Sequence, residues 1–408
     1  MRVSNKQMLN SVTRSVATTS EQLLKLQQRA ASMKMINRPS DDPSGMNKVL
    51  DYRTKIASVD QYLRNIESAK TRVEATVTNL ETVYDLLNDA KEIAIGQTAG
   101  GDGSGRETAA TQIGNIYDQI RDIANTRIGG SYIFAGHQTD TMPFPKNKVI
   151  TEAASELSGG EYFNISSDTD DYYVWYNIDG GSDDPKDDNP SLGTLSAVEV
   201  PISSTDTADQ VAAATQAAID ALADFDATVS GDEVTITLAS NGDGVEITDM
   251  NTQFDLYNTT YNGDSGALNT IVGEGAALKT NAHGNETFTG SGVTGGVDVL
   301  GVLETLKEAL EDSSYDPVIV DNQVGEINKA VSQVESMAAN QSVAYSRLEK
   351  TEDYLGNLKL TFETTLSATE DADSAEVAVE LQAQETAYEM ALASAAAVLE
   401  MNILDFLR

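Results

Sequence analysis

The feature that most constrains this chain is a heptad repeat of apolar residues at each end. In the first forty residues these side chains recur at alternating steps of three and four, the spacing of one face of a coiled-coil helix. This first seam consists of Leu9, Val12, Val16, Thr19, Leu23, Leu26, Ala30 and Met33. The last helix carries a second seam at Ala378, Leu381, Glu385, Tyr388, Leu392, Ala395 and Leu399. Because pairing the two helices covers both seams, we predict a terminal coiled coil.

Long helices also fill the flanks of the chain. In the first third of the chain, apolar residues at heptad spacing predict a helix over about 42–98. A similar stripe predicts a shorter helix over 106–128, which Gly129 ends. Towards the C-terminus, leucines at helical spacing predict a helix over 300–310, followed by a long helix after Pro317. A helix of this length is a rod, since each residue adds about 1.5 Å.

The middle of the chain has a different character. Residues 151–290 hold 26 of the 64 acidic residues and only two of the 27 basic ones. Alternating or continuous apolar runs predict strands at Tyr172–Ile178 and Ser196–Ile202, with a helix over 207–225. A further strand pair is expected at 234–238 and 245–247, joined across Gly242–Gly244.

These patterns predict a mainly α chain: a long antiparallel helical rod with a terminal coiled coil and a β-hairpin, plus an inserted α+β outer domain. We expect residues 1–40 and 372–408 to form the coiled coil. The rod takes 41–149 and 293–371, with the hairpin near 131–145. The acidic insert takes 150–292.

Composition excludes several classes of function. A net charge of −37 repels phosphate backbones, so no nucleic-acid partner is expected. The chain has no Cys and only two His, His137 and His283, so we expect no enzyme, metal site or cofactor. The sequence contains no stretch of about 18 apolar residues, so we expect no membrane span. The acidic run 179–188 lacks EF-hand spacing and is expected to be a solvated loop, with Ca²⁺ binding left open.

Three motifs resemble the bacterial flagellin family. The first is the turn after the first helix, where Ser40 is expected to cap the next helix; its motif residues are Asn37, Pro39, Ser40, Asp41, Asp42 and Pro43. The second is a hairpin motif with Tyr132, Phe134 and Gly136. The third is the C-terminal tail. The Pro-Ser-Asp-Asp-Pro form of the turn is similar to the hook-associated branch of that family, and the resemblance covers roughly 1–145 and 300–408.

The resemblance implies a structural adapter in the extracellular flagellum, at the junction of hook and filament. It implies type III export, assembly as a ring of copies, contact with flagellin and with another hook-associated protein, and an export chaperone on the C-terminal helix. The alternative is a filament subunit; an adhesin or phage-tail-like fibre is disfavoured by heptads at both ends. The expected assembly interface is formed by Leu9, Val12, Val16, Leu23, Leu26, Ala30, Met33, Leu381, Tyr388, Leu392, Leu399, Ile403 and Phe406.

Overall fold

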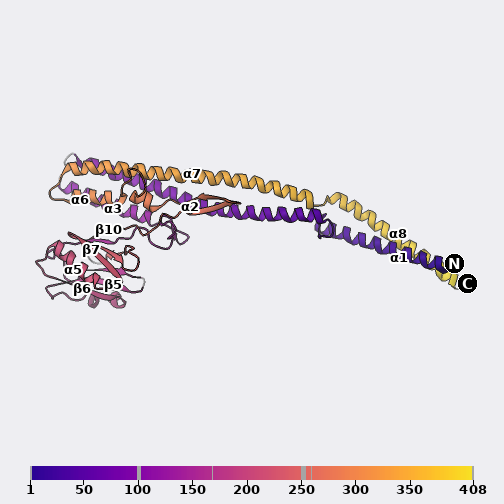
Figure 1. Cartoon of the computed structure of the whole chain (residues 1–408), viewed down its shortest axis with the longest axis horizontal. Helices are drawn as coiled ribbons and strands as arrows, with labels where there is room; N and C mark the ends of the chain where they lie inside the picture. Colours follow the sequence, from indigo (N-terminus) through magenta and orange to yellow (C-terminus); the bar gives the residue numbers. More distant parts are fainter. Residues whose placement is uncertain (1, 99–102, 168, 250–253, 259, 407–408) are drawn as a thin grey trace. The chain divides into compact units, whose positions relative to one another are not determined.

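The computed structural model of the 408-residue chain describes residues 2–98, 103–167, 169–249, 254–258 and 260–406. It divides into two compact units (Figure 1). The first combines Met1–Asn65 with Lys350–Arg408, and the second is Ile66–Glu349. The expected fold class, mainly α with an inserted α+β domain, is confirmed.

The first unit is built around two antiparallel helices, α1 (Arg2–Ser32) and α8 (Ser374–Phe406), which lie side by side. The N-terminal seam faces α8 as predicted: its residues from Leu9 to Ala30 are half-buried, while the positions between them are mostly exposed. Met33 is the exception, at 54% exposed. The helix ends at Ser32, and Met33 has φ 53°, so its side chain leaves the helical face.

The seam of α8 is shifted by one residue from the predicted phase at every second position. Its buried or half-buried residues are Val377, Leu381, Gln384, Ala387, Tyr388, Ala391, Ala395 and Val398. Leu381, Tyr388 and Ala395 were therefore placed correctly. Ala378 and Glu385 were not. Leu392 and Leu399 face α1 across an open groove and stay 44% and 49% exposed, while the neighbouring Ala391 and Val398 are half-buried. At these two steps both neighbours are apolar, so the pattern alone does not show which is the more buried.

The remaining helices belong wholly or partly to the second unit. They are α2 (Pro43–Thr98), α3 (Gly103–Ala124), α6 (Val299–Glu311) and α7 (Pro317–Glu370). Leucine, isoleucine and valine side chains from these four helices form one core, which includes Leu80, Leu87, Ile113, Ile120, Leu303, Leu306, Ile327 and Val334. The third helix ends at Ala124 and not near 128. Asn125 instead exchanges hydrogen bonds with the backbone of Phe144, which turns the chain away.

A β-hairpin follows α3, but four residues earlier than predicted. Strands β1 (Arg127–Ile128) and β2 (Ser131–Tyr132) pair across Gly129 and Gly130, both of which have positive φ. Glycine favours this left-handed two-residue turn because it has no Cβ. Residues 133–145 carry no strand and pack irregularly against the helical core.

The inserted domain has two four-stranded sheets, ordered β10-β3-β8-β7 and β6-β5-β4-β9. The strands are β3 (Lys148–Ile150), β4 (Tyr162–Ser166), β5 (Asp171–Ile178), β6 (Ser196–Ile202), β7 (Phe225–Ser230), β8 (Glu233–Leu238), β9 (Thr248–Asp249) and β10 (Asp255–Tyr257). Helix α5 (Ala208–Asp220) contacts β6 of one sheet and β7 and β8 of the other. Two short helical segments, α4 (Pro185–Asp188) and η1 (Pro190–Thr194), precede β6.

The predicted strands at 172–178, 196–202 and 234–238 are confirmed, whereas the helix end was wrong and the expected pairing across Gly242–Gly244 holds only in part. The helix predicted over 207–225 ends at Asp220, whose carboxylate accepts a hydrogen bond from the Ala227 backbone, and Phe225 begins β7. Residues 245–247 do not form a strand with 234–238. The chain does turn back on β8 across Gly242–Gly244, where the Leu238 N–H donates to the Asp243 carbonyl at 2.7 Å and the Val245 N–H to the Ile236 carbonyl at 3.3 Å. The pairing stops there, because β3 takes the next part of that edge and Ile247 donates its N–H to the Lys146 carbonyl.

The return from the insert to the rod runs through a hairpin, β11 (Asn269–Gly273) with β12 (Ala276–Lys279), and a π-helical turn, η2 (Asn285–Thr289). The insert's core begins at Val149 and its last buried residue is Phe254. Tyr257, Ala282 and Phe288 pack into the helical core instead. The apolar cores therefore divide the chain near residue 254, upstream of the predicted boundary at 292. Within the described residues no helix has the length and hydropathy needed to cross a membrane.

Candidate assembly surface

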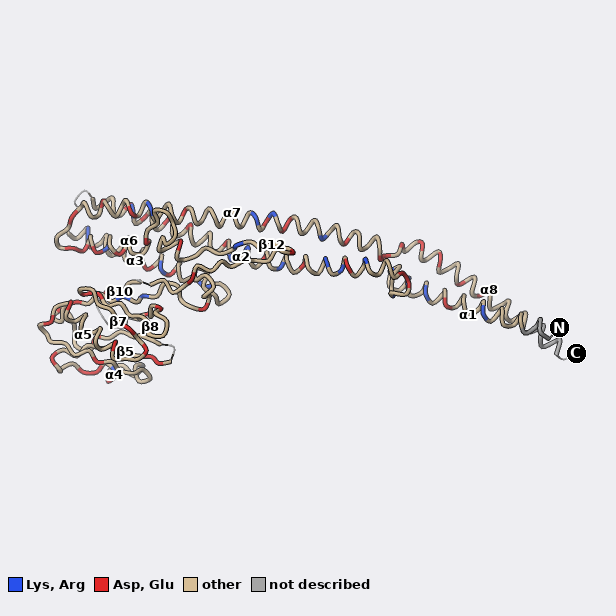
Figure 2. The backbone as a smooth tube through the Cα atoms, viewed as in Figure 1, with Lys and Arg blue, Asp and Glu red and all other residues tan. Residues whose placement is uncertain are grey.

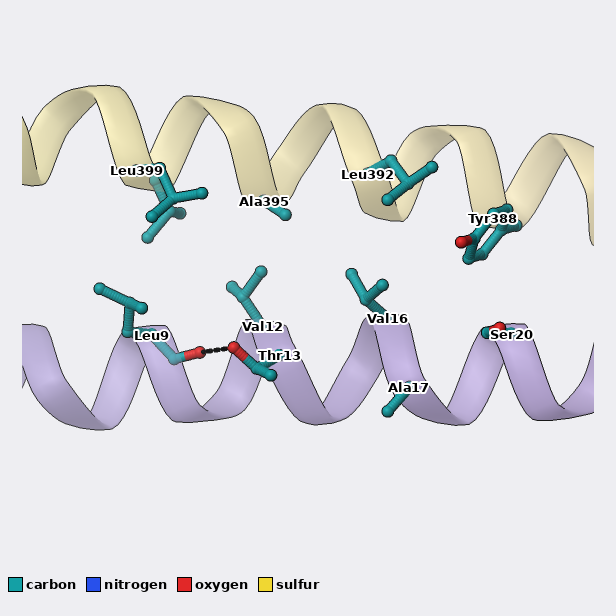
Figure 3. A pocket seen from close by; sticks show the side chains of 11 residues that line it. Leu9, Val12, Thr13, Val16, Ala17, Ser20, Tyr388, Leu392, Ala395 and Leu399 are labelled. Carbon is teal, nitrogen blue, oxygen red and sulfur yellow. Dashed lines mark hydrogen bonds between the residues drawn. The ribbon is translucent and has the colours of Figure 1, made fainter.

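The two terminal helices enclose an apolar groove with a volume of about 400 Å³ (Figure 3). It is lined by Leu9, Val12, Thr13, Val16, Ala17, Ser20, Tyr388, Leu392, Ala395, Val398 and Leu399. No lining residue carries a charge. The only polar side chains are two hydroxyls of α1 and the phenol of Tyr388, and Thr13 donates its hydroxyl hydrogen back to the Leu9 carbonyl at 2.9 Å. A groove of this chemistry can bind an apolar side chain or helix face.

The groove exists because small residues stand where larger ones would fill the seam. Figure 3 shows Val12 and Val16 of α1 pointing towards α8, where Ala395 lies between Leu392 and Leu399. A single methyl at Ala395 leaves the two valines with little to pack against. Polar contacts between α1 and α8 are few among the described residues. In one of them, at one end of the groove, Gln384 Nε2 donates to the Thr19 carbonyl at 3.2 Å and to Gln22 Oε1 at 3.1 Å.

Large apolar side chains also point away from the pair. Met8, Leu24, Val379 and Met390 are between 49% and 69% exposed, and Leu399 on the rim of the groove is 49% exposed. Of the other expected interface residues, Leu23, Leu26 and Ala30 are half-buried against α8. Ile403 and Phe406 lie in the last turns of α8, and their side chains fall outside the described ones. The groove, together with the exposed Leu399 on its rim, is the apolar surface that this pair offers to a partner.

The turn motif ends α1 and starts α2 by hydrogen bonds within itself. Asp41 Oδ2 accepts from the backbone N–H groups of Arg38 at 2.9 Å and of Asn37 at 3.1 Å, and the Arg38 bond is the main reason that the pKa of Asp41 is lowered. Asp42, not Ser40, caps α2, because Asp42 Oδ1 accepts from the Ser44 N–H at 3.0 Å. Pro43 is the first helical residue, where its missing N–H costs nothing. Pro39 and Ser40 are exposed.

A buried carboxylate that the sequence analysis missed joins this turn to the end of α7. Glu370 is 4% exposed; its carboxylate forms an ion pair with Arg53 and another with Lys34 at 2.6 Å. Two backbone hydrogen bonds join the same segments: the Met35 N–H donates to the Glu370 carbonyl, and the Ala372 N–H donates to the Met33 carbonyl. Both chain connections of the first unit are therefore fastened at one point.

The hairpin-motif residues have structural positions. The Tyr132 ring lies under the Arg127 guanidinium at 4.6 Å, and Phe134 is fully buried against Phe288. Gly136 has φ 69°, and a Cβ there would come within 2.3 Å of the Asp264 backbone carbonyl. The motif thus holds the segment after β2 against the residues that return from the insert.

One group of three carboxylates in the described part of the chain has the spacing of metal ligands: Glu233, Glu304 and Glu308. The ammonium of Lys148 already lies among them, paired with Glu304 and 3.4 Å from Glu233. Burial raises the pKa of Glu308. We interpret the group as an internal ion pair between α6 and the sheet, in a domain that Figure 2 shows to be rich in acidic residues.

The acidic run at 179–188 is organised by its own backbone. Asp184 caps the short helix α4 by accepting from the Lys186 N–H, and also accepts from the Tyr173 hydroxyl. Asp179 accepts from the Ser204 N–H, and its pKa is lowered by hydrogen bonds from Ser204. Among the described residues these carboxylates do not converge into a ligand set.

Comparison with known proteins agrees with the resemblance found in the motifs. Residues 3–139 match the family model of the bacterial flagellin N-terminal helical region. Flagellar hook-associated protein 3 of Escherichia coli is 30% identical over 152 residues, which are 36% of this chain and 47% of that protein. The protein of the same name from Salmonella typhimurium is 27% identical over 164 residues, 40% of this chain and 50% of that one. The chain thus matches about half the length of these relatives.

The fold is also similar to a solved structure described as a flagellar hook-associated protein of Vibrio parahaemolyticus. The two share 16% identity with a TM-score of 0.50, over 81% of this chain and all of the other. At this identity the likeness concerns the fold. Together these comparisons confirm the resemblance to flagellin-like hook-associated proteins, the hook–filament junction branch of the flagellin family.

Proposed function

We propose that this chain is a structural adapter of the bacterial flagellum, which joins the hook-associated zone to the flagellin filament through its terminal helices. The observation that carries the proposal is the α1–α8 pair. Its groove and its outward apolar side chains are open in the single chain, and they are suited to helices of neighbouring copies. The hook-associated relatives and the flagellin N-terminal match support the same role.

The proposed partners follow from this role. Copies of the chain form a ring, with another hook-associated junction protein on one side and flagellin on the other. The chain is exported unfolded through the type III route, and a chaperone covers α8 beforehand. Exposed apolar side chains on α8, such as Val379 and Met390, support a need for such protection. The protein's place is then the extracellular flagellum, at the hook–filament junction, with no catalytic task.

Within this role we also propose a division of labour along the chain. The terminal coiled coil, 1–40 with 372–408, makes the assembly contacts. The helical rod carries load between the two lattices, and the acidic insert faces water and keeps copies from associating through the wrong surface. The second candidate function is a filament subunit, supported by the flagellin match at residues 3–139.

Leu392→Asp tests the assembly surface. Leu392 lines the groove and is 44% exposed, so a carboxylate there keeps its water in the single chain and loses it when another copy docks. We expect the purified variant to keep wild-type helicity by circular dichroism, and cells that carry it to lose filaments from their hooks. Ser394→Asp, two residues away and exposed, is the matched control and should retain filaments. Equal filament retention in both variants would contradict the proposed surface.

A further inference from the structure

The chain's two histidines, 146 positions apart in sequence, come together where the inserted domain joins the helices. His137 follows β2 on the way into the insert, and His283 precedes η2 on the way back. The His137 side chain is more than half exposed; its backbone N–H donates to Asp264 Oδ1 at 2.6 Å, and its ring Nε2 lies 3.2 Å from the Ala267 carbonyl. His283 has a very different environment.

His283 is 3% exposed, and neither of its ring nitrogens has a hydrogen-bond partner among the described residues. A neutral imidazole offers one donor and one acceptor, and both are left without a partner in this site. The surrounding packing leaves no room for adjustment: a Cβ on the next residue, Gly284, would come within 2.8 Å of the Phe134 carbonyl. Natural proteins rarely bury such a group without a partner, so its position calls for a functional reason.

The buried ring lies where the two connectors of the insert meet. The outgoing connector, 133–145, contributes Phe134 and Phe144, and the returning connector, 257–290, contributes Tyr261 and Phe288; their rings pack 5.1–5.2 Å apart. Next to His283, the Gly284 N–H donates to the Phe134 carbonyl at 2.9 Å, and the Tyr261 hydroxyl donates to the same carbonyl at 2.7 Å. Opening at His283 would therefore separate both connectors.

Four titratable groups lie around the ring, three from the returning connector and His137 from the outgoing one, and their effects on the ring oppose one another. Glu286 of η2 and Asp264 of the returning connector favour a charged imidazolium, while Lys279 of β12 and His137 disfavour it. Burial is the largest influence, and it lowers the pKa of His283. Burial also raises the pKa of the nearby Tyr261 phenol, so this group stays neutral. The Asp264 carboxylate already accepts hydrogen bonds from the backbone N–H groups of His137 and Gly266. These bonds lower the pKa of Asp264 and occupy its carboxylate.

We propose that His283 is an acid-sensitive lock at the base of the inserted domain: when its ring gains a proton, the connectors 133–145 and 257–290 separate and the domain is released from the helices. A charged imidazolium needs two acceptors, and the closed site supplies neither. The open site supplies water. Acid therefore favours the open form.

The direction and the pH window follow from linkage. An accessible histidine in the open form takes up its proton near pH 6.5, whereas the closed form takes it up only at lower pH. The closed form is thus most stable above about pH 6.5. Below it, the ratio of closed to open molecules falls by up to tenfold for each pH unit, until the pH reaches the lowered pKa of the closed form.

Hydrogen exchange of the full-length chain between pH 7.5 and 5.5 tests the lock. After correction for the intrinsic exchange rate, protection in 133–145 and 257–290 should fall as the pH drops below 6.5 in the wild type, by at most about tenfold per pH unit. His283→Gln cannot take up the proton and should show no such fall. His137→Gln, the matched control, keeps the His283 ring and should still show a fall. A fall of the same size in His283→Gln, or its absence from the wild type, would overturn the proposal.

Histidine-selective NMR gives a readout that does not require the His283 variant to fold. Only two ring resonances exist, and the one that disappears in His137→Gln assigns both. In the wild-type chain the His283 resonance should titrate below the ordinary histidine value of about 6.5, together with the loss of protection. Titration of His283 near pH 6.5, with the connectors still protected, would show that the buried ring has only a packing role.

Discussion

At the scale of single residues, Glu370 shows how one buried charge can fix the end of a helix. Its carboxylate is 4% exposed and meets Lys34 and Arg53, whose side chains are 39% and 47% exposed. The two cations stay partly hydrated, whereas the buried carboxylate depends on them to stabilise its charge. Removing the negative charge therefore costs a charge-assisted contact and recovers little solvation.

Glu370→Gln is expected to weaken the joint of the first unit by about 2 kcal/mol. The loss should be local, with faster hydrogen exchange at residues 33–37 and 370–373 and little change in the second unit. Glu363→Gln is the matched control on the same helix, because Glu363 is 46% exposed and its Lys359 partner lies 3.8 Å away. It should cost less than about 0.5 kcal/mol. Equal protection of both segments in the two variants would refute the account of the joint.

The sequence could not have indicated Glu370, because its partner Arg53 lies 317 residues away. Local motifs are easier to predict than such distant pairs. The turn at 37–43 lies where its prolines and aspartates predict, although Asp42 takes the capping position expected for Ser40. Capping depends on which residue has extended backbone immediately before the helix, and Ser40 and Asp42 are both suitable types. The same limit applies to Lys148, whose partner Glu304 comes from a distant helix.

At the scale of elements, periodicity predicted the long helices well and the phase of α8 less well. The N-terminal seam alternates apolar and polar residues clearly, and its residues from Leu9 to Ala30 face α8. In α8 the pairs 391/392 and 398/399 are both apolar, so two seams fit the pattern. Ala391 and Val398 are the more buried of each pair, while the larger leucines, Leu392 and Leu399, line the open groove between the helices.

Leu381→Asp tests this phase, because Leu381 lies in the observed seam while Val379, two residues earlier, is 69% exposed. A carboxylate at 381 loses the apolar burial of leucine and adds a desolvation cost, so the α1–α8 pair should be destabilised by about 3 kcal/mol. Val379→Asp should change stability by less than about 0.5 kcal/mol. Thermal unfolding followed at 222 nm measures both, and a larger loss at 379 than at 381 would reverse the assigned seam.

At the scale of the whole molecule, the acidic composition of the middle correctly separated an α+β insert from the helices but misplaced its end. Residues 257–292 share the insert's scarcity of basic residues, with Lys279 alone, yet Tyr257, Ala282 and Phe288 complete the helical core. Composition reports which residues face water, and these three do not. Where a domain ends is decided by which apolar side chains share a core, and that depends on contacts over long distances in the chain.

This division predicts which part of the insert can be removed. Ile150 of β3 and Asp255 of β10 are direct antiparallel partners, so an Asn-Gly turn can replace residues 151–254 and close a hairpin. The shortened chain should keep its helicity and unfold cooperatively. Removal of 150–292 also deletes the buried ring of Phe288, worth about 3–5 kcal/mol, and should broaden or abolish the transition. Calorimetry of the two deletions makes the comparison, and equal behaviour would contradict the division of cores.

The central claim, an adapter at one point of the flagellum, is tested most directly by locating the protein. A small epitope at the exposed turn residue Asn241 lies far in sequence from both terminal helices and leaves their groove untouched. Gold-labelled antibody on intact flagella should then mark a single position where each filament meets its hook, in cells whose only copy of the protein carries the epitope. Labelling along the length of the filament would contradict the account and identify the chain as a filament subunit.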